Sequence, residues 1–425
     1  MTGPLADVRV LDASGAIGHY AGRLLADLGA DVIKVEPRGG DPARLYAPLL
    51  PGVDAPESGL QYLLLNANKR GVALDLEDDR GRDALLRLVA GADVLLESWR
   101  PEEARSLRLT DAELREANPS LIHTSITGFG ITGPHAEWAY ADIVGIATSG
   151  VMNLAGFPDG PPESLPDHQG YHCASLDAVA GTLTALLHRD AGGPGQLVEV
   201  AMQEALSIAQ ETAMQNYDIR EFTLQRLGEA SQVNPMNLPG FGLYECAEGM
   251  VYIMTTGTAG AGFAGLVEMM DEHGQAGDLK EEPHWSFIQT QMDGANLRRM
   301  LTEEESREET QKFLDHLEEL VTAFMSAHPA SYVYEEGQKR RVLVGLIATP
   351  ADIAGDEHLA DRDWFLEVED AGRGKTLRYP GFPFRMHATP PTLRRPAPLL
   401  GEHTAEVLAQ AGVPPEEIAA LEATA

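Results

Sequence analysis

The chain has 425 residues, of which 44% are hydrophobic and 23% are charged, so it is long enough for two domains with sizeable cores. Its formal net charge of -33 at pH 7 argues against nucleic acid as the main partner and against docking on an anionic membrane, because both need a basic face. An anionic ligand would therefore require a local basic patch.

The cysteines and the N-terminus bear on the compartment. Cys173 and Cys246 are too few for a disulfide framework. The opening residues, MTGPLADVRVLDASG, lack the basic start and the long apolar run of a signal peptide. No segment approaches about 18 uninterrupted apolar residues, so we expect no membrane span and a cytoplasmic protein.

Strand and helix patterns alternate from the N-terminus onward. VRVLD (8–12) is typical of a buried strand, 19–29 of a helix ending at Gly29, and VIKVE (32–36) of a second strand. A strand, helix and strand joined by short loops predict a βαβ unit with parallel strands. The alternation continues with strands expected at 72–76, 93–98 and 121–126 and helices at 79–91 and 110–117. This order predicts a doubly wound α/β sheet.

A loop rich in glycine and proline, GFGITGP (128–134), follows the last of these strands. Such loops line the ligand crevice in open parallel sheets. A long apolar helix is expected over 172–189, then a strand at 197–202 and a helix at 203–217.

Composition shifts after about residue 224, where short strands give way to very acidic helices over 262–330. The apolar run at 342–349 resembles a return to a sheet, and a helix at 401–412 closes the chain. We predict a large domain from 1–224 and 341–425 and a smaller inserted domain at 225–340.

Two basic clusters precede or follow strands in this acidic chain. EPRGGDPAR places Arg38 and Arg44 in a loop just after a parallel strand, a location that suits a phosphorylated ligand. NANKRG brings Asn68 next to Lys69 before the following strand. Solvated surface turns explain both clusters equally well on the residues alone.

A third cluster, ESWRPEEARSLR (97–108), sets Arg100, Arg105 and Arg108 beside Trp99. An aromatic ring next to guanidinium groups can stack on an adenine and hold its phosphates. The alternative is a helix that starts after a proline and pairs its arginines with neighbouring glutamates. The histidines are scattered and no C-x-x-C occurs, so we expect no metal site.

Together these segments resemble CoA-transferase family III, the CaiB/BaiF family. The resemblance runs along nearly the whole chain and includes LADVRVLD, LLADLGADVIKVEPRGGDPAR, NANKRGVALDLEDDRGRDALLRLVAGADVLLES, NPSLIHTSITGFGITGP, GTLTALLHRDAGGPGQLVEVAMQEAL and RYPGFPFRMHATPPTLRRPAPLLGEHTAEVL. It implies a Rossmann-like large domain built from both chain ends, an inserted small α+β domain, and an interlocked dimer. It also implies that CoA lies in a cleft of the large domain.

The resemblance further implies a covalent mechanism in which an aspartate attacks an acyl-CoA thioester. A mixed anhydride forms, then an aspartyl-CoA thioester, and CoA finally passes to the acceptor acid. That aspartate falls ten residues before Gly181 and 18 before Arg189, and both counts lead to Tyr171. A phenol with a pKa of about 10 is a poor acyl carrier near neutral pH.

Other acids and bases lie near Tyr171 in the sequence. His172 follows it directly, and Asp142 precedes it by 29 residues. Asp177 is six residues further along the expected helix, about 9 Å of rise, so it should not simply replace the aspartate. The racemases of the family need a histidine where this chain has Ala141, which disfavours that activity.

The positions that contact CoA in the family match in part. Arg44, Asn68 and Lys69 are retained, and an Asn–Phe pair is replaced by Ser98 and Trp99. The family arginine of the R-L-G-L segment falls at Ser106, with Arg105 adjacent. Coenzyme A or acyl-CoA, with a carboxylic acid acceptor, is therefore the expected ligand.

Three functions follow from the resemblance and the missing aspartate. The first is a subunit similar to the non-catalytic one of succinyl-CoA:benzylsuccinate CoA-transferases, paired with an aspartate-bearing paralogue. The second is a homodimeric acyl-CoA isomerase, hydratase or lyase that uses Tyr171, His172 or Asp142. The third is a non-enzymatic acyl-CoA-binding protein. The acid substrate is not fixed by the sequence, although the subunit resemblance favours aromatic or dicarboxylic acids.

Overall fold

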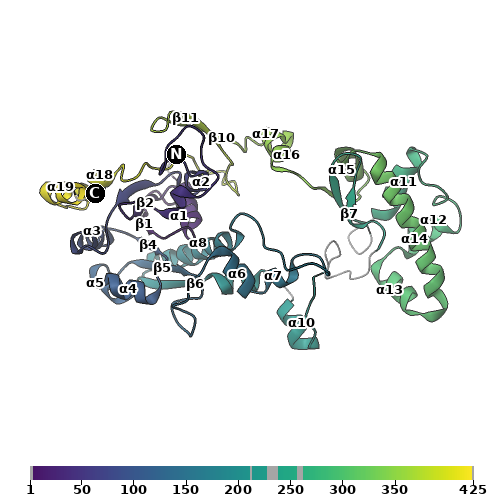
Figure 1. Ribbon diagram of the computed structural model, residues 1–425, viewed down its shortest axis with the longest axis horizontal. Helices are drawn as coiled ribbons and strands as arrows, with labels where there is room; N and C mark the ends of the chain where they lie inside the picture. Colours follow the sequence, from purple (N-terminus) through teal and green to yellow (C-terminus); the bar gives the residue numbers. More distant parts are fainter. Residues whose placement is uncertain (1–2, 211–212, 227–237, 256–261, 424–425) are drawn as a thin grey trace. The chain divides into compact units, whose positions relative to one another are not determined.

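The computed structural model describes residues 3–210, 213–226, 238–255 and 262–423 (Figure 1). The chain divides into two compact units. Unit 1 comprises Met1–Asn153, Glu163–Arg220 and Glu357–Ala425, and unit 2 comprises Leu154–Pro162 and Glu221–Asp356. Unit 1 is thus built from both ends of the chain.

Unit 1 contains a six-stranded sheet with the order β3-β2-β1-β4-β5-β6, in which every neighbouring pair is parallel. The strands are β1 (Arg9–Ala13), β2 (Asp31–Glu36), β3 (Arg70–Ala73), β4 (Val94–Glu97), β5 (Ile122–Thr127) and β6 (Gln196–Ala201). The predicted doubly wound α/β sheet is confirmed. The strand expected at 72–76 begins two residues earlier than predicted.

Both faces of this sheet are covered by helices, because its strands are apolar on both sides. Successive residues point to opposite faces, so Val10 belongs to one core cluster and Leu11 to the other. One face carries α1 (His19–Asp27), α8 (Gln169–Asp190) and α9 (Met202–Ile208), and the other carries α3 (Asp79–Val89), α5 (Asp111–Ala117), α18 (Thr404–Gln410) and α19 (Pro415–Ala423).

Shorter elements complete unit 1. They are η1 (Pro42–Leu45), α2 (Leu60–Asn66), α4 (Pro101–Leu107), α6 (Asp142–Thr148), α10 (Ala213–Arg220), α17 (Glu357–Asp361) and the hairpin of β10 (Leu366–Asp370) and β11 (Lys375–Tyr379). A four-residue helix, α7 (Val151–Leu154), lies where the chain passes from unit 1 to unit 2.

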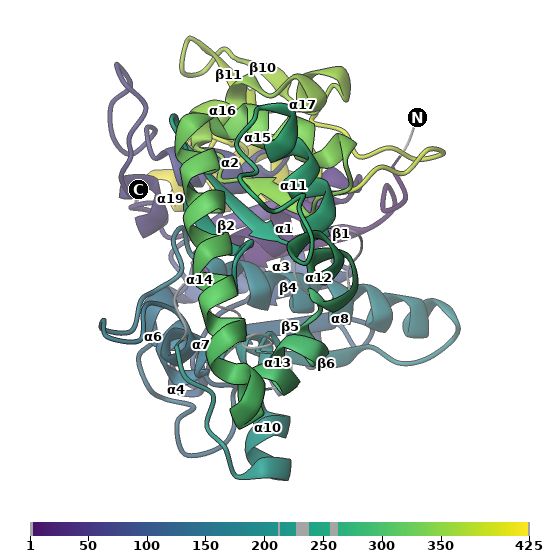
Figure 2. The ribbon, with the colours of Figure 1, turned by 90° about the vertical axis from the view of Figure 1, so that its right-hand side faces the viewer.

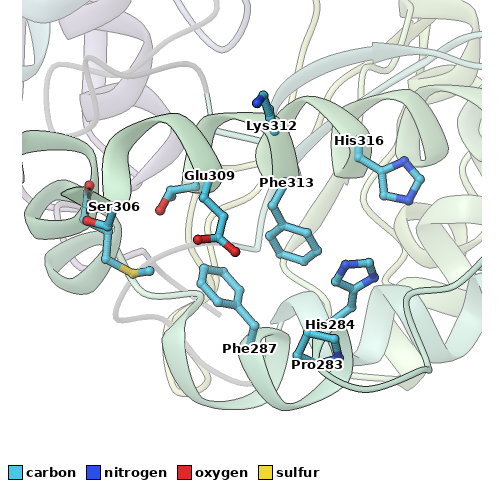
Figure 3. A pocket seen from close by; sticks show the side chains of 10 residues that line it. Pro283, His284, Phe287, Ser306, Glu309, Lys312, Phe313 and His316 are labelled. Carbon is cyan, nitrogen blue, oxygen red and sulfur yellow. Dashed lines mark hydrogen bonds between the residues drawn. The ribbon is translucent and has the colours of Figure 1, made fainter. Parts of the chain in front are cut away.

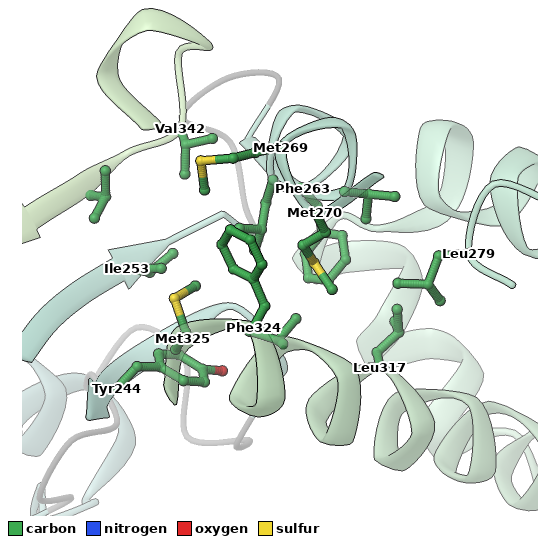
Figure 4. Close-up of a cluster of buried hydrophobic side chains, with 14 of the residues drawn as sticks. Tyr244, Ile253, Phe263, Met269, Met270, Leu279, Leu317, Phe324, Met325 and Val342 are labelled. Atoms are coloured by element: carbon green, nitrogen blue, oxygen red, sulfur yellow. The ribbon is translucent and has the colours of Figure 1, made fainter. Parts of the chain in front are cut away.

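Unit 2 has a small antiparallel sheet of β7 (Phe241–Glu245), β8 (Met250–Met254) and β9 (Val344–Leu346). Its helices are α11 (Gly262–Glu272), α12 (His284–Gln291), α13 (Gly294–Thr302), α14 (Glu304–Ala327), α15 (Ala330–Lys339) and α16 (Pro350–Gly355). The long helix α14 stands beside α13 (Figure 2). Phe263, Phe324 and Met325 lie in the apolar core between sheet and helices (Figure 4).

The strand expected within 342–349 forms, but it pairs with β8 inside unit 2 rather than with the large sheet. Unit 2 therefore runs to Asp356, whereas the sequence placed the end of the inserted domain at 340. An apolar run indicates a strand but does not say which sheet completes its hydrogen bonds.

His123 in β5 sits between two carboxylates and links strand to helix. Its Nδ1 lies 3.0 Å from Asp111 Oδ1 in α5, and its Nε2 lies 3.2 Å from Glu97 Oε1 in β4. Burial lowers the pKa of His123, but the hydrogen bonds and charges of the two carboxylates outweigh it and raise the pKa to about 9.

We expect this histidine to make stability fall at alkaline pH. A pKa above the unfolded value of about 6.5 means that the stabilisation is complete below pH ~6.5 and is lost as pH rises through about 9, on the order of 2–3 kcal/mol. The free energy of urea unfolding of wild type should drop over this window, whereas His123→Gln should lack that part of the drop. Equal pH slopes for both proteins would contradict the assignment.

Candidate active site

The order of the strands locates a ligand crevice in unit 1. The chain proceeds from β1 to β2 and β3 on one side and then resumes with β4 on the other side of β1. Ligands of open α/β sheets bind outside the carboxyl ends of the strands at such a switch point. The segments that follow β1 and β4 are Ser14–Gly15 and Ser98–Trp99.

Ser98 holds these two segments together. Its Oγ accepts a hydrogen bond from the backbone N–H of Gly15 at 2.8 Å, and its carbonyl accepts one from the Tyr140 hydroxyl at 3.0 Å. Trp99 beside it is buried. Ser98 and the Tyr140 hydroxyl therefore lie together at the switch point between β1 and β4.

Tyr140 was not predicted from the sequence, because an aromatic two residues before Asp142 carries no signal of its own. Its ring packs against Gly128 of the GFGITGP loop, where an added Cβ would lie 2.4 Å from Tyr140 Cβ. Burial raises the pKa of Tyr140 far above that of an ordinary phenol, so its hydroxyl is a neutral donor. Tyr140 and Tyr171 pack on the same apolar cluster.

Tyr171 lies in the first turn of α8, the helix expected from residue 172. Its backbone N–H donates to Asp142 Oδ1 at 3.0 Å, so the Asp142 carboxylate satisfies one of the free amides of the helix start. Asp142 is itself buried, at the first residue of α6. The Tyr171 ring stacks on His168 at 5.5 Å, and His168 stacks on Tyr46 at 6.5 Å.

This environment keeps the Tyr171 phenol neutral. Burial, and then the negative charge of Asp142, raise its pKa to about 12. A neutral phenol can donate a hydrogen bond to a developing oxyanion but is not a nucleophile near pH 7. Asp177 is exposed and lies six residues further along α8, so it is not brought to Tyr171.

His172 points to a different side of α8 from Tyr171, since successive helical residues are about 100° apart. Its ring lies 5.0 Å from that of Tyr20 in α1, and burial lowers its pKa. His168 and His172 have the i, i+4 spacing of some metal ligands, contrary to the expectation that the histidines are only scattered. The described residues contain no group of three or more His, Cys, Asp or Glu side chains placed to hold a metal.

Three predicted CoA contacts, Arg44, Asn68 and Lys69, lie in the interior of unit 1. Arg44 has no exposed surface and donates to Glu36 through Nε (2.7 Å) and Nη2 (2.8 Å) and to Glu57 through Nη1. Asn68 donates to Asp27 and to the backbone carbonyl of residue 392. These side chains therefore connect segments of unit 1 from the inside of the protein.

Lys69 lies at the centre of a buried charge network. Its Nζ donates to Asp12 Oδ2 (2.7 Å), Asn66 Oδ1 (2.7 Å) and the His19 carbonyl (2.9 Å), so all three of its protons are used. Lys34 donates to the Ser14 carbonyl in the same network. These contacts fix the segment after β1, which forms one wall of the crevice.

The predicted Arg105 and Arg38 are on the outside of unit 1. Arg105 is exposed and pairs with Glu137 at 2.7 Å, and the Glu137 carbonyl accepts a hydrogen bond from Arg100 at 3.2 Å. Arg38 follows β2, and its Nε is buried without a hydrogen bond among the described residues. The structure thus places Ser98 beside Gly15 at the switch point, buries Trp99 in an apolar core cluster and leaves Arg105 tied to an acid.

A cavity of about 530 Å³ lies in unit 2 between α12 and α14, with Phe287, Phe313, His284 and His316 in its walls (Figure 3). None of the predicted site residues lines it. In the described ranges no helix has both the length and the apolar character needed to cross a membrane.

Comparisons with known proteins give the same family along nearly the whole chain. The model of CoA-transferase family III matches residues 5–404. The chain is 33% identical to succinyl-CoA:(R)-benzylsuccinate CoA-transferase subunit BbsE of Thauera aromatica, over 96% of this chain and 95% of that protein. It is also 33% identical to the succinyl-CoA:mesaconate CoA-transferase of Haloarcula hispanica, over 97% of both chains. The crystal structure of a CaiB/BaiF family protein from Brucella suis matches with a TM-score of 0.79 and 26% identity, over 97% of this chain and 100% of that one.

Proposed function

The chain belongs to CoA-transferase family III, and we propose that it is the aspartate-lacking subunit of a cytoplasmic, heteromeric CoA-transferase that uses succinyl-CoA. The observation that carries this proposal is the neutral phenol of Tyr171 at the start of α8. A transferase of this type needs a carboxylate that can form an anhydride and then a thioester. Tyr171 supplies neither, so the carboxylate comes from a partner chain.

The most informative relative supports the same division of labour. BbsE is named as a subunit of a succinyl-CoA-dependent transferase and is similar to this chain over nearly its full length. The proposed partner is a paralogue with an aspartate at the position of Tyr171, joined to this chain as an interlocked dimer. The proposed acceptor is an aromatic or dicarboxylic acid.

In this proposal the partner's aspartate attacks the thioester carbonyl of succinyl-CoA and expels the CoA thiolate. The thiolate then attacks the aspartyl carbonyl of the anhydride, which releases succinate and leaves CoA on the enzyme. The acceptor carboxylate then attacks the aspartyl-CoA carbonyl and expels the thiolate, which gives a second anhydride. The thiolate attacks the acceptor's carbonyl in that anhydride, which forms the new acyl-CoA and releases the aspartate. In this chain Ser98 joins the segments after β1 and β4, the Tyr140 hydroxyl donates to the Ser98 carbonyl, and the neutral hydroxyl of Tyr171 is offered as the hydrogen-bond donor.

Direct CoA contacts in this chain are proposed for Arg38, Ser98 and Arg105, whereas Trp99 is buried in an apolar core cluster and is proposed to support them from there. Arg44, Asn68 and Lys69 are proposed to act on CoA only indirectly, because their donors are engaged inside the protein. A phosphate of CoA would have to compete with Glu137 for Arg105.

Reconstitution with the partner tests the proposal. The chain and an aspartate-bearing paralogue are purified separately and together and assayed with succinyl-CoA and candidate acids. We expect CoA transfer only from the mixture, and a hydroxylamine-derived mass tag only on the partner's aspartate. Turnover by this chain alone would overturn the subunit assignment.

A homodimeric enzyme with its own nucleophile is the second candidate, because the buried Asp142 carboxylate touches the first turn of α8. In that case succinyl-CoA and hydroxylamine would leave the mass tag on Asp142 in the chain alone. CoA binding without a tag or turnover, with or without the paralogue, would instead indicate a non-enzymatic acyl-CoA-binding protein.

A further inference from the structure

A cavity of about 280 Å³ lies within unit 1, on the side of α8 to which His172 points. Its walls come from α1, from α2, from the first turn of α8 and from the segment around Trp364 and Pro380. All of these segments belong to the same compact unit. The cavity is therefore a feature of the large unit by itself.

The lining is mainly apolar, with Leu24, Leu64, Leu65, Trp364 and Pro383 in its walls. An apolar cavity of about 150 Å³ already accommodates a benzene molecule. A volume of about 280 Å³ thus fits a phenyl ring with a short linker or a branched alkyl group.

The charged side chains of the wall are already neutralised. Arg23 donates to Asp27 at 2.6 Å through Nε and to the Leu64 carbonyl at 2.5 Å through Nη1. Asn68 also donates to Asp27, at 2.6 Å. An anionic group gains little from such a pair, so a carboxylate is not the part of a ligand that this cavity selects.

One buried polar atom of the cavity wall, and one in a residue next to the wall in sequence, have no hydrogen-bond partner among the described residues. One is Nε2 of His172, which lines the cavity. The other is the hydroxyl of Tyr379, whose ring lies 5.8 Å from the Arg23 guanidinium and which directly precedes the lining residue Pro380. Buried polar atoms are nearly always paired, so we expect ordered water at these two atoms, beside the apolar part of the cavity.

We propose that this cavity binds the apolar substituent, a phenyl ring or a branched alkyl group, of the acid whose carboxyl group reacts at the start of α8. The reaction at that place rests on the proposed function, whereas the cavity itself does not. His172 and Tyr171 are consecutive, with Cα atoms about 3.8 Å apart. Their side chains point to different sides of α8, so in this proposal the linker of the acid passes around the start of the helix, from the cavity at His172 to the carboxyl group at Tyr171 and Asp142.

Calorimetric titration of the purified full chain with two probes tests the proposal directly. The probes are 3-phenylpropanoate and propanoate, which differ only by the ring. We expect the ring to raise affinity by about tenfold or more, as hydrophobic pockets commonly do for groups of this size. Equal affinities for the two probes would overturn the proposal.

Two variants of Leu64 place the effect in the cavity. Leu64→Trp should fill it and abolish the preference for the ring, while Leu64→Ala should enlarge it and favour 3-(2-naphthyl)propanoate over 3-phenylpropanoate. Leu187→Trp adds the same indole at an exposed position of α8 and should leave the preference unchanged. A wild-type ring preference that both Leu64 variants retain would show that the ring binds elsewhere.

Titration with CoA and the reconstitution assay separate this proposal from the proposed function. A ring preference that depends on Leu64, with no CoA transfer in any mixture, would leave the cavity assignment standing and remove the transferase subunit. CoA transfer by the mixture, with no ring preference in binding, would support the transferase subunit and remove the cavity assignment.

Discussion

Tyr171→Asp is expected to convert this chain into one that accepts an acyl group by itself. After incubation with succinyl-CoA and hydroxylamine, the variant should carry a mass tag on the peptide containing residue 171, and wild type should carry none. CoA transfer by the variant alone should exceed that of wild type by on the order of a hundredfold or more, because a carboxylate replaces a neutral phenol. The start of α8 favours such a carboxylate through the helix dipole.

Asp142 gives the variant a characteristic pH dependence. Its carboxylate contacts the backbone N–H of residue 171, so a second carboxylate there meets a like charge that raises its pKa. Activity of the variant should therefore be lost as pH falls through that raised pKa. The control is Tyr171→Asn, because asparagine has nearly the same size as aspartate but no nucleophilic carboxylate. This variant should stay inactive at every pH. A tag on Asp142 in wild type and in both variants would show that Asp142 is the nucleophile.

The sequence predicted the sheet and the start of α8 because those features are local. Continuous apolar runs such as VRVLD mark strands buried on both faces, and the resemblance to the family implies, through residue counts from Gly181 and Arg189, that Tyr171 stands at the aspartate position. Which sheet receives the strand at Val344–Leu346 is a tertiary property that an apolar run does not carry.

The burial of the predicted cofactor residues could not be predicted from local sequence patterns. Arg44 also donates to the Pro398 carbonyl, 354 residues away in the sequence, and Asn68 donates to the Thr392 carbonyl, 324 residues away. A basic turn looks the same in the sequence whether the far end of the chain covers it or leaves it in water. The same holds for Tyr140, which reaches the crevice only because Gly128 lets its ring approach.

Lys69→Met is expected to destabilise the protein by about 3–5 kcal/mol, because it leaves the buried Asp12 carboxylate without its closest cation. Neither side chain of this pair has exposed surface, and their charged atoms are 2.7 Å apart. Burial lowers the pKa of Lys69 to about 8, so the ammonium is still charged at pH 7. Urea unfolding of the full chain measures the loss, and hydrogen exchange of the β1 amides reports on unit 1.

A surface pair in the same chain supplies the matched control. Lys312 pairs with Glu308 at the same distance of 2.7 Å, but its side chain is 74% exposed, so Lys312→Met should cost less than about 0.5 kcal/mol. Adding Asp12→Leu to Lys69→Met should recover much of the lost stability, since it removes the unpaired carboxylate. If Lys69→Met cost no more than Lys312→Met, water would have to reach Asp12. The segment after β1 would then be open to solvent, and Lys69 would be free to contact CoA directly.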